Sequence, residues 1–189
     1  MMRALVVYES MFGNTRAIAN AIADGLSDRM RVEVLEVGAA PATIGGDVAL
    51  LVVGGPTHAF GMSRPQTRQD AARQAPAGLV SRGSGLREWL ATLQAPAGIA
   101  AATFDTRIRK PRLPGSAARA AEKRLRRLGF RIVAPAASFH VEGTLGPLQE
   151  GEQQRARRWG ESVGSKSGDP GRVKLGRGPA GLRGSSRSA

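Results

Sequence analysis

Short apolar runs alternate along the chain with segments in which apolar residues recur every three or four positions. The continuous runs at 4–8 and 48–53 are typical of strands buried on both faces of a sheet. The alternating pattern at 31–37 predicts a strand nearer an edge. Weaker runs predict two more strands, at 99–104 and 131–137. Pro135 should end the last of these early or confine it to an edge.

Helical periodicity occupies the connections between these strands. Apolar residues at helical spacing predict helices over 15–26, 86–93, 117–128 and 148–163. The connection at 41–47 is too short for a regular helix. Alternation of strand and helix across five strands predicts an α/β fold, a doubly wound three-layer sandwich with a five-stranded parallel sheet.

Two stretches do not fit this alternation. The segment 61–85 is a long, arginine-bearing excursion after the third strand, which predicts either a functional lid or a mobile loop. From Gly164 onward Gly, Ser, Arg and Pro dominate, and such a composition cannot bury a core. We therefore expect one domain over 1–163 and a disordered basic tail over 164–189.

The composition excludes several kinds of site. The chain has no cysteine and two histidines, so disulfides, Cys-ligated zinc and iron–sulfur clusters are excluded, and we expect no metal site. The longest apolar run, at 48–53, is far shorter than the roughly 20 residues that span a bilayer. Tyr8 and Glu9 follow the first apolar run at once, unlike a signal peptide. A cytoplasmic protein without membrane contact is expected.

The net charge of the chain is strongly positive and is shared between the tail and the rest of the chain. The chain carries 28 Lys and Arg against 15 Asp and Glu, a formal net charge of +13. Five of these units belong to the tail over 164–189, and the remaining residues carry +8. Because this is not the dense basic stripe of a dedicated nucleic-acid binder, we do not expect nucleic acid as the partner.

Candidate chemistry gathers after the strands, where ligands bind in open parallel sheets. The first strand is followed by Ser10, Gly13, Asn14 and Thr15, which with the start of a helix form a potential anion site of phosphate size. His58 follows the third strand, Asp105 and Thr106 the fourth, and His140 the fifth. Phenylalanines lie at the same edge (Phe60, Phe104 and Phe139). This combination suits a flat, heteroaromatic phosphate ester.

The run Ser10-Met11-Phe12-Gly13-Asn14-Thr15 resembles the phosphate-binding loop of the flavodoxin family, in which Ser/Thr-x-aromatic-or-Thr-Gly-Asn-Thr follows the first strand. Gly-Gly-Pro-Thr-His at 54–58 resembles that family's second, flavin-lining loop. The order of elements agrees over residues 3–163, which implies a flavodoxin-like fold with strand order 2-1-3-4-5 and FMN as the cofactor.

The resemblance also implies a role for each matching residue. The phosphate of FMN would be held by Ser10, Asn14 and Thr15 and by the backbone of Met11, Phe12 and Gly13. Residues lining the isoalloxazine would be Pro56, Thr57, His58 and Ala59, with Phe104, Asp105 and Thr106 as a third loop. That loop lacks the family's Gly-Asp pair and ring-stacking tyrosine, and Phe60 or Phe104 could stack instead. His58 beside the ring would respond to pH near its ordinary pKa of about 6.5.

The resemblance implies an electron carrier with no catalytic acid or base. The flavin would supply the redox chemistry, and the basic surface would steer a redox partner protein with an acidic surface. One alternative is a flavin-dependent reductase or oxidase of a small substrate such as a quinone or porphyrinogen, with 61–85 as a substrate lid. Another is a binding module that has kept the fold and lost the flavin. Activity with a small-molecule donor favours the enzyme, and a null FMN titration favours the binding module.

Overall fold

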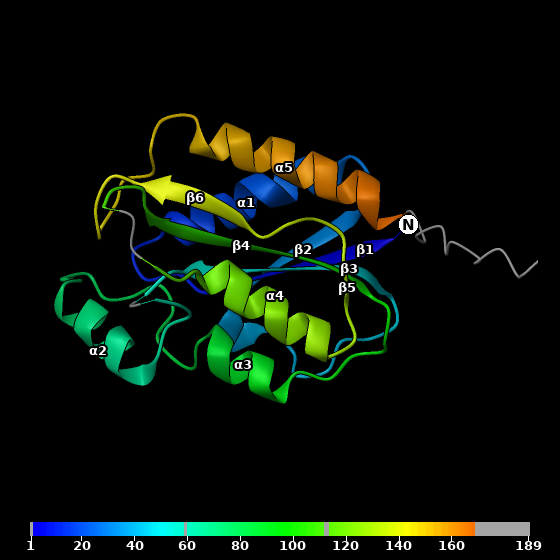
Figure 1. Ribbon diagram of the computed structural model, residues 1–189, viewed down its shortest axis with the longest axis horizontal. Coiled ribbons are helices and arrows are strands. Elements are labelled where there is room, and N and C mark those ends of the chain that lie inside the picture. Colours follow the sequence, from blue (N-terminus) through cyan, green and yellow to red (C-terminus); the bar gives the residue numbers. More distant parts are fainter. Residues whose placement is uncertain (1, 59, 112–113, 169–189) are drawn as a thin grey trace, which may run out of the picture.

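A parallel β-sheet forms the middle layer of the molecule (Figure 1). The computed structural model describes residues 2–58, 60–111 and 114–168. Its strands pair in the order β2-β1-β3-β4-β5, with β6 also paired to β4, and every pairing is parallel. The strands are β1 Arg3–Tyr8, β2 Arg31–Glu36, β3 Val48–Pro56, β4 Ala100–Ile108, β5 Arg131–Ile132 and β6 Ala137–Val141. The predicted order is confirmed, and β2 lies at an edge as its alternating pattern indicates.

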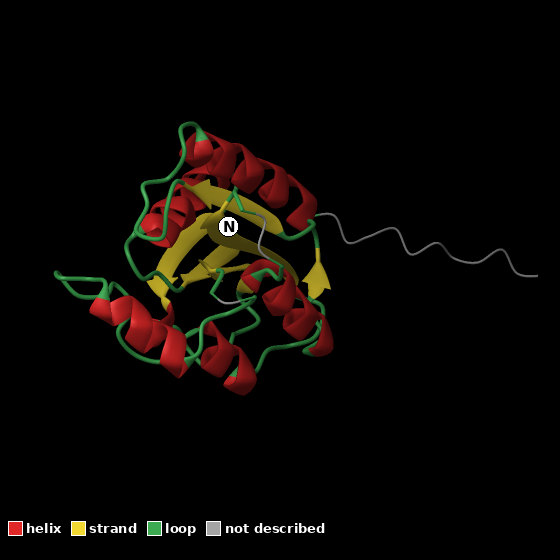
Figure 2. Ribbon diagram, turned by 60° about the vertical axis from the view of Figure 1, so that its left-hand side comes forward, coloured by secondary structure: helices red, strands yellow, loops and turns green. Residues whose placement is uncertain are grey.

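Helices cover both faces of the sheet (Figure 2). The α-helices are α1 Asn14–Ser27, α2 Pro65–Arg73, α3 Leu86–Thr92, α4 Ala117–Arg127 and α5 Glu152–Ser167, and η1 Val37–Ala39 is a short 3₁₀ helix. Side chains of β1 divide between the two faces, because Ala4 and Val6 belong to the core under α1 and α5, whereas Leu5 and Val7 belong to the core under α3 and α4. The three-layer prediction is thereby confirmed.

Three elements differ from the sequence-based prediction. The segment 61–85 contains a helix, α2, in which Ala71 alone is buried. The fifth strand is divided, since the chain leaves the ladder after Val133 and pairs with β4 again from Ala137. Pro135 lies in that interruption, which agrees with the prediction that the strand ends early. β4 continues four residues beyond its predicted end at Phe104, so Asp105 and Thr106 are strand residues rather than loop residues.

The last helix is also displaced from its prediction. α5 begins at Glu152, because Gly151 takes a left-handed backbone (φ 78°) that precludes an earlier start. It ends at Ser167, so the first four residues of the predicted tail are helical. The rest of the predicted tail, from 169 onward, lies outside the described residues. In the part of the chain that the structure describes, no helix has the length and apolar character needed to cross a membrane.

A cluster of three aromatic rings packs α5 against β4 and β6 of the sheet. Phe104, Phe139 and Trp159 meet edge to face, with ring centroids 6.2–6.4 Å apart. The Phe104 ring lies directly over Gly54, where an added Cβ would approach it to 2.0 Å. β3 therefore needs glycine at this position for the neighbouring strand to place its ring in the core.

Candidate functional site

The loop between β1 and α1 is held in a compact turn by hydrogen bonds to the hydroxyl of Ser10. Ser10 Oγ accepts hydrogen bonds from the backbone N–H groups of Gly13 (3.1 Å) and Arg16 (3.3 Å). Gly13 has φ 93°, a left-handed conformation that side chains other than glycine resist, and it directly precedes α1. Because the oxygen of Ser10 accepts two amide protons, its own proton remains available to a ligand.

The same loop leaves backbone donors without protein acceptors. Among the described residues, no group accepts a hydrogen bond from the N–H groups of Met11, Phe12, Asn14 or Thr15. Free N–H groups at the first turn of a helix attract anions, because the helix dipole places partial positive charge there. The loop thus has the donor set of a phosphate-sized site.

A cavity of about 250 Å³ opens between this loop and the ends of β3, β4 and β6. Of the residues that the structure describes, its walls contain one cation, Arg107, and no carboxylate, so none of these residues repels an anion. The lining residues are Ser10, Met11, Phe12, Asn14, Thr15, Pro56, Thr57, His58, Thr106, Arg107, Ile108, Val141 and Thr144. The structure therefore brings together most of the residues predicted from the sequence.

Hydroxyl groups connect the walls of this small cavity. Thr15 Oγ1 and Thr106 Oγ1 lie 2.7 Å apart in a hydrogen bond that joins α1 to β4. Thr57 Oγ1 donates to Asp105 Oδ2 (2.9 Å) and accepts from the N–H of Ala117 at the start of α4 (2.9 Å). These bonds fix the positions of the hydroxyls before any ligand arrives.

A tight turn follows β3 at the mouth of the small cavity. His58 and Gly61 exchange both backbone hydrogen bonds, at 2.8 and 2.9 Å. Within the turn Phe60 has φ 79° and is 64% exposed, so its ring projects toward solvent. Burial lowers the pKa of His58, and the positive charge of Arg68 lowers it further. The imidazole is therefore neutral at pH 7, and it titrates below the ordinary range expected from the sequence. Ala59 lies outside the described residues.

Two of the predicted flavin contacts are placed elsewhere. Phe104 has no exposed surface and packs in the aromatic cluster, so the prediction that it stacks on a ligand ring is wrong. Asp105 is also fully buried, and its Oδ2 accepts from the hydroxyls of Thr57 and Ser116 and from the N–H of Ala118. Asp105 acts as an anchor beneath the small cavity, while Thr106 alone of this group lines it.

Sequence reasoning missed the contribution of the far ends of β4 and β6. Arg107 and Ile108 continue β4 into the cavity wall, and Val141 and Thr144 complete it from the end of β6. The Asn14 amide donates to the backbone oxygen of Leu145 (3.2 Å), so the loop after β6 is held against the phosphate-like loop. The polar character of residues 105–107 concealed this extension of β4.

The segment 61–85 is tied to the site by buried polar groups. Glu9, which is 1% exposed, accepts from the hydroxyl of Ser63 (2.5 Å) and the N–H of Leu86 (2.9 Å), and Arg68 also donates to Ser63 Oγ. Burial raises the pKa of Glu9. Ser81 pairs with Ser10 through both backbone and side chain. The segment therefore packs against the first loop at both of its ends.

Metal binding finds no support in the part of the chain that the structure describes. No group of three or more His, Cys, Asp or Glu side chains there is arranged to hold a metal ion. The chemistry of the small cavity rests on amide and hydroxyl donors, with a neutral imidazole at its edge.

Comparison with known proteins gives likeness in structure alone. No protein-family model matches the chain, and no curated protein matches it. A flavodoxin from the domain Archaea matches 88% of this chain and 99% of its own, with TM-score 0.61 and 21% identity. Flavodoxin 2 from Bacillus cereus matches 87% and 99%, with TM-score 0.62 and 21% identity.

A larger protein contains the same unit. The flavodiiron core of Flv1 from Synechocystis sp. matches 88% of this chain with 36% of its own length, at TM-score 0.59 and 19% identity. The strand order of the sheet and these likenesses point to the same architecture. The chain therefore has the flavodoxin-like fold.

Proposed function

We propose that this protein binds FMN in the small cavity and acts in electron transfer. The observation that carries the proposal is the donor set of residues 10–15, in which four backbone N–H groups and two hydroxyls line the small cavity. Within the described ranges these N–H groups have no protein acceptor and no carboxylate lines the cavity. These donors fit the phosphate of a flavin mononucleotide. The flavodoxins of the same fold support this choice of ligand.

The chain's own residues would bind and orient the cofactor. Ser10 and Thr15 would donate to the phosphate, while Pro56, Thr57 and His58 line the wall beside it. Thr57 is held in place by Asp105, and Thr15 by Thr106. FMN, when bound, supplies the ability to accept and release electrons. The residues of the small cavity then need no catalytic acid or base.

Electron transfer requires a second redox partner, which we propose to be a protein with an acidic surface. The support is the net charge of +8 over residues 1–163, because unlike charges steer two proteins into encounter. A carrier of this kind transfers electrons only when its partner protein is present. Turnover with a small-molecule donor and acceptor alone would instead favour the reductase or oxidase alternative.

The visible spectrum and an FMN titration test the proposal. The purified protein should be yellow or should quench the fluorescence of added FMN at 1:1 stoichiometry. The double variant Ser10→Ala/Thr15→Ala should bind FMN more weakly by at least about 100-fold, since each lost hydrogen bond to a charged group costs about 1.5–3 kcal/mol.

A matched control removes two hydroxyls far from the small cavity. Ser162 and Ser165 lie exposed on α5, and Ser162→Ala/Ser165→Ala should bind FMN as the unmodified protein does. Circular dichroism should show that both double variants are folded. Folded, unmodified protein that remains colourless and leaves FMN fluorescence unchanged would overturn the proposal and favour the binding module.

A further inference from the structure

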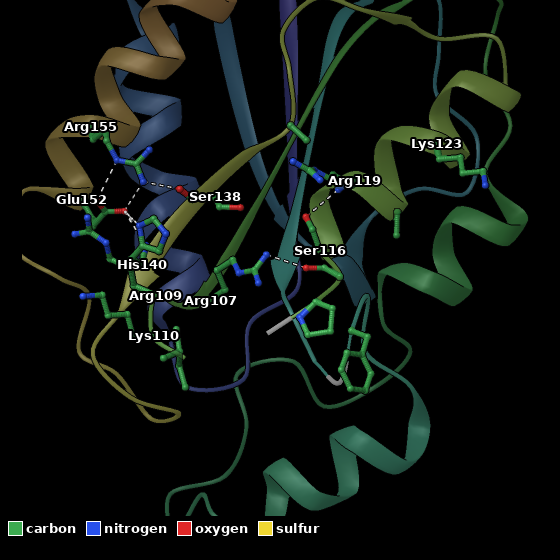
Figure 3. A pocket seen from close by; sticks show the side chains of 16 residues that line it. Arg107, Arg109, Lys110, Ser116, Arg119, Lys123, Ser138, His140, Glu152 and Arg155 are labelled. Atoms are coloured by element: carbon green, nitrogen blue, oxygen red, sulfur yellow. Dashed lines mark hydrogen bonds and ion pairs between the residues drawn. The ribbon is translucent and has the colours of Figure 1, made fainter. Parts of the chain in front are cut away.

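A second, broader cavity of about 1220 Å³ adjoins the small one (Figure 3). The end of β4, the first half of α4, β6 and the start of α5 surround it. Arg107 and Ile108 line both cavities, so a molecule seated in the broad cavity lies next to the proposed cofactor.

Positive charge dominates the broad cavity. Among the described residues, six cationic side chains line it, against one carboxylate, that of Glu152. This carboxylate is already engaged by Arg155 at 2.5 Å and by the backbone N–H of His140 at 2.7 Å. The cations come from β4 and the residues after it, from α4 and from α5. Figure 3 shows those of α4 on one side of the cavity and the others on the opposite side: Arg107, Arg109, Lys110, Arg119, Lys123 and Arg155. The cavity therefore carries a concentrated positive field.

Two of these cations occupy positions that weaken their own helix. Arg119 lies in the first turn of α4, where the helix dipole disfavours positive charge, and Lys123 follows it at i+4 as a like charge. Both side chains are exposed, and neither forms an ion pair with any residue in the described ranges. Their placement costs stability and gains no internal partner, which points to an external anion.

An exposed aromatic ring stands at the rim of the same cavity. Phe60 lines it, is 64% exposed and is held at φ 79°. A positive φ is unfavourable for a bulky residue, so the fold displays this ring at an energetic cost. Exposed aromatic rings surrounded by arginines are typical of the residues that dominate protein–protein binding.

We propose that the broad cavity and the Phe60 ring form the docking surface for an acidic segment of a redox partner protein. The identity of the partner as a redox protein rests on the proposed function, whereas the acidic character of the ligand rests on the cations. The volume exceeds the range of about 300–1,000 Å³ usual for small-molecule pockets, which favours a macromolecule. The cations lie on two sides of a hollow rather than in a stripe along one element, which favours a folded protein's acidic segment over nucleic acid.

The test uses a fluorescently labelled octaglutamate peptide as the probe and fluorescence anisotropy as the measurement, on the full chain with and without FMN. Binding should be detectable at low salt. The variant Arg119→Glu/Lys123→Glu should bind the peptide at least about tenfold more weakly, because it reverses two charges of the cavity. It should remain folded, since a carboxylate in the first turn suits the dipole of α4. Its FMN affinity should be unchanged, because neither residue lines the small cavity.

The matched control reverses two exposed arginines outside both cavities, as Arg29→Glu/Arg158→Glu. It changes the net charge equally and should retain the peptide affinity of the unmodified protein. Equal losses in the two double variants would overturn the proposal in favour of a general charge effect. A single-stranded oligonucleotide that binds more tightly than octaglutamate at equal salt, and is lost in the same α4 variant, would overturn it in favour of nucleic acid.

The same experiment separates this inference from the proposed function. If the peptide binds through α4 while FMN does not bind, the docking surface stands and the electron-transfer function fails. If FMN binds and no variant or salt condition reveals peptide binding, the docking surface is overturned and the cofactor proposal is unaffected.

Discussion

The two adjoining cavities share a wall but are built from different kinds of groups. The small cavity presents backbone N–H groups and hydroxyls that are fixed by internal hydrogen bonds. The broad cavity presents long cationic side chains, most of them exposed, from separate elements of the fold. Fixed dipoles in a partly enclosed site recognise a small group at short range, whereas exposed charges act over about 10 Å and are screened by salt. The first arrangement suits a retained cofactor and the second a partner that arrives and leaves.

Asp105 contacts residues of both cavities, so its substitution should have the largest effect and should perturb both of them. Its Oδ2 accepts from Thr57 of the small cavity and from Ser116 of the broad one. Asp105→Ala leaves these hydroxyls and the N–H of Ala118 without their acceptor in the core. We expect a loss of about 3 kcal/mol in the free energy of unfolding, measured by chemical denaturation.

The conservative variant Asp105→Asn retains one acceptor oxygen at the same place. It should recover about half of that loss, and FMN and peptide affinities should weaken together in the alanine variant. Unchanged stability in Asp105→Ala would show that Asp105 does not anchor the two cavities.

Glu9 supports the small cavity alone. Glu9→Ala removes the acceptor of the Ser63 hydroxyl and the Leu86 N–H, and should cost about 2 kcal/mol of stability. Because these bonds hold the segment 61–85, limited proteolysis within 74–83 should become faster. Glu9→Gln keeps an acceptor for Leu86 and should be milder in both measurements. Equal proteolysis of all three proteins would contradict this role.

Salt should weaken peptide binding at the broad cavity much more than FMN binding at the small cavity. Raising NaCl from 50 to 500 mM should weaken octaglutamate binding by about tenfold or more, because the exposed cations are screened. FMN affinity should change by less than about threefold over the same range, since amide and hydroxyl donors carry no net charge and Arg107 is a single, half-buried cation. Fluorescence titrations of each ligand at both salt concentrations measure the difference. Parallel losses would show that both sites rest on the same long-range charge.

Mild acid should lower the free energy of unfolding slightly, which is the smallest effect expected, through one histidine at each cavity. Burial is the main cause that lowers the pKa values of His58 and of His140 in the folded protein. Their contribution to stability is complete above the unfolded pKa of about 6.5 and is lost as pH falls from there toward the lowered folded values. Denaturation at pH 7.5 and 5.5 should therefore show a smaller loss for His58→Gln than for the unmodified protein. The buried Glu9 acts in the opposite sense, because its raised pKa favours the folded state as pH falls. The free energy of unfolding of His58→Gln is therefore compared with that of the unmodified protein at each pH, since both contain Glu9.

The fold was predictable where apolar patterns are strong. The runs at 4–8 and 48–53 form central strands in which every residue of the two runs except Ala49 is buried, and the first loop was identifiable because its six residues are consecutive. α2 escaped prediction because it has no apolar stripe and buries Ala71 alone, although Pro65 at its first turn was a usable signal.

The rest of the site depends on contacts between distant segments. Phe104 is the last residue of the apolar run at 99–104 and looks available to a ligand, yet it packs against Phe139 and Trp159, which lie 35 and 55 residues away in the chain. The cations of the broad cavity converge from β4, α4 and α5, so that no local pattern reveals them. The sequence gives the net charge of the chain, but the electric field at a site depends on which charged side chains the fold brings there.

The short backbone pairing between the first loop and the segment 61–85 has a kinetic consequence. The N–H of Val80 donates to the backbone oxygen of Met11 (3.0 Å), and that of Ser81 to the oxygen of Ser10 (2.8 Å). These two amide protons can exchange with solvent only when the segment separates from the loop. If FMN enters and leaves by that separation, the rate of opening sets an upper limit on the rate of cofactor dissociation, and the exchange of these two protons measures that rate under conditions in which every opening leads to exchange. The residence time of the flavin would then be determined outside the groups that touch it.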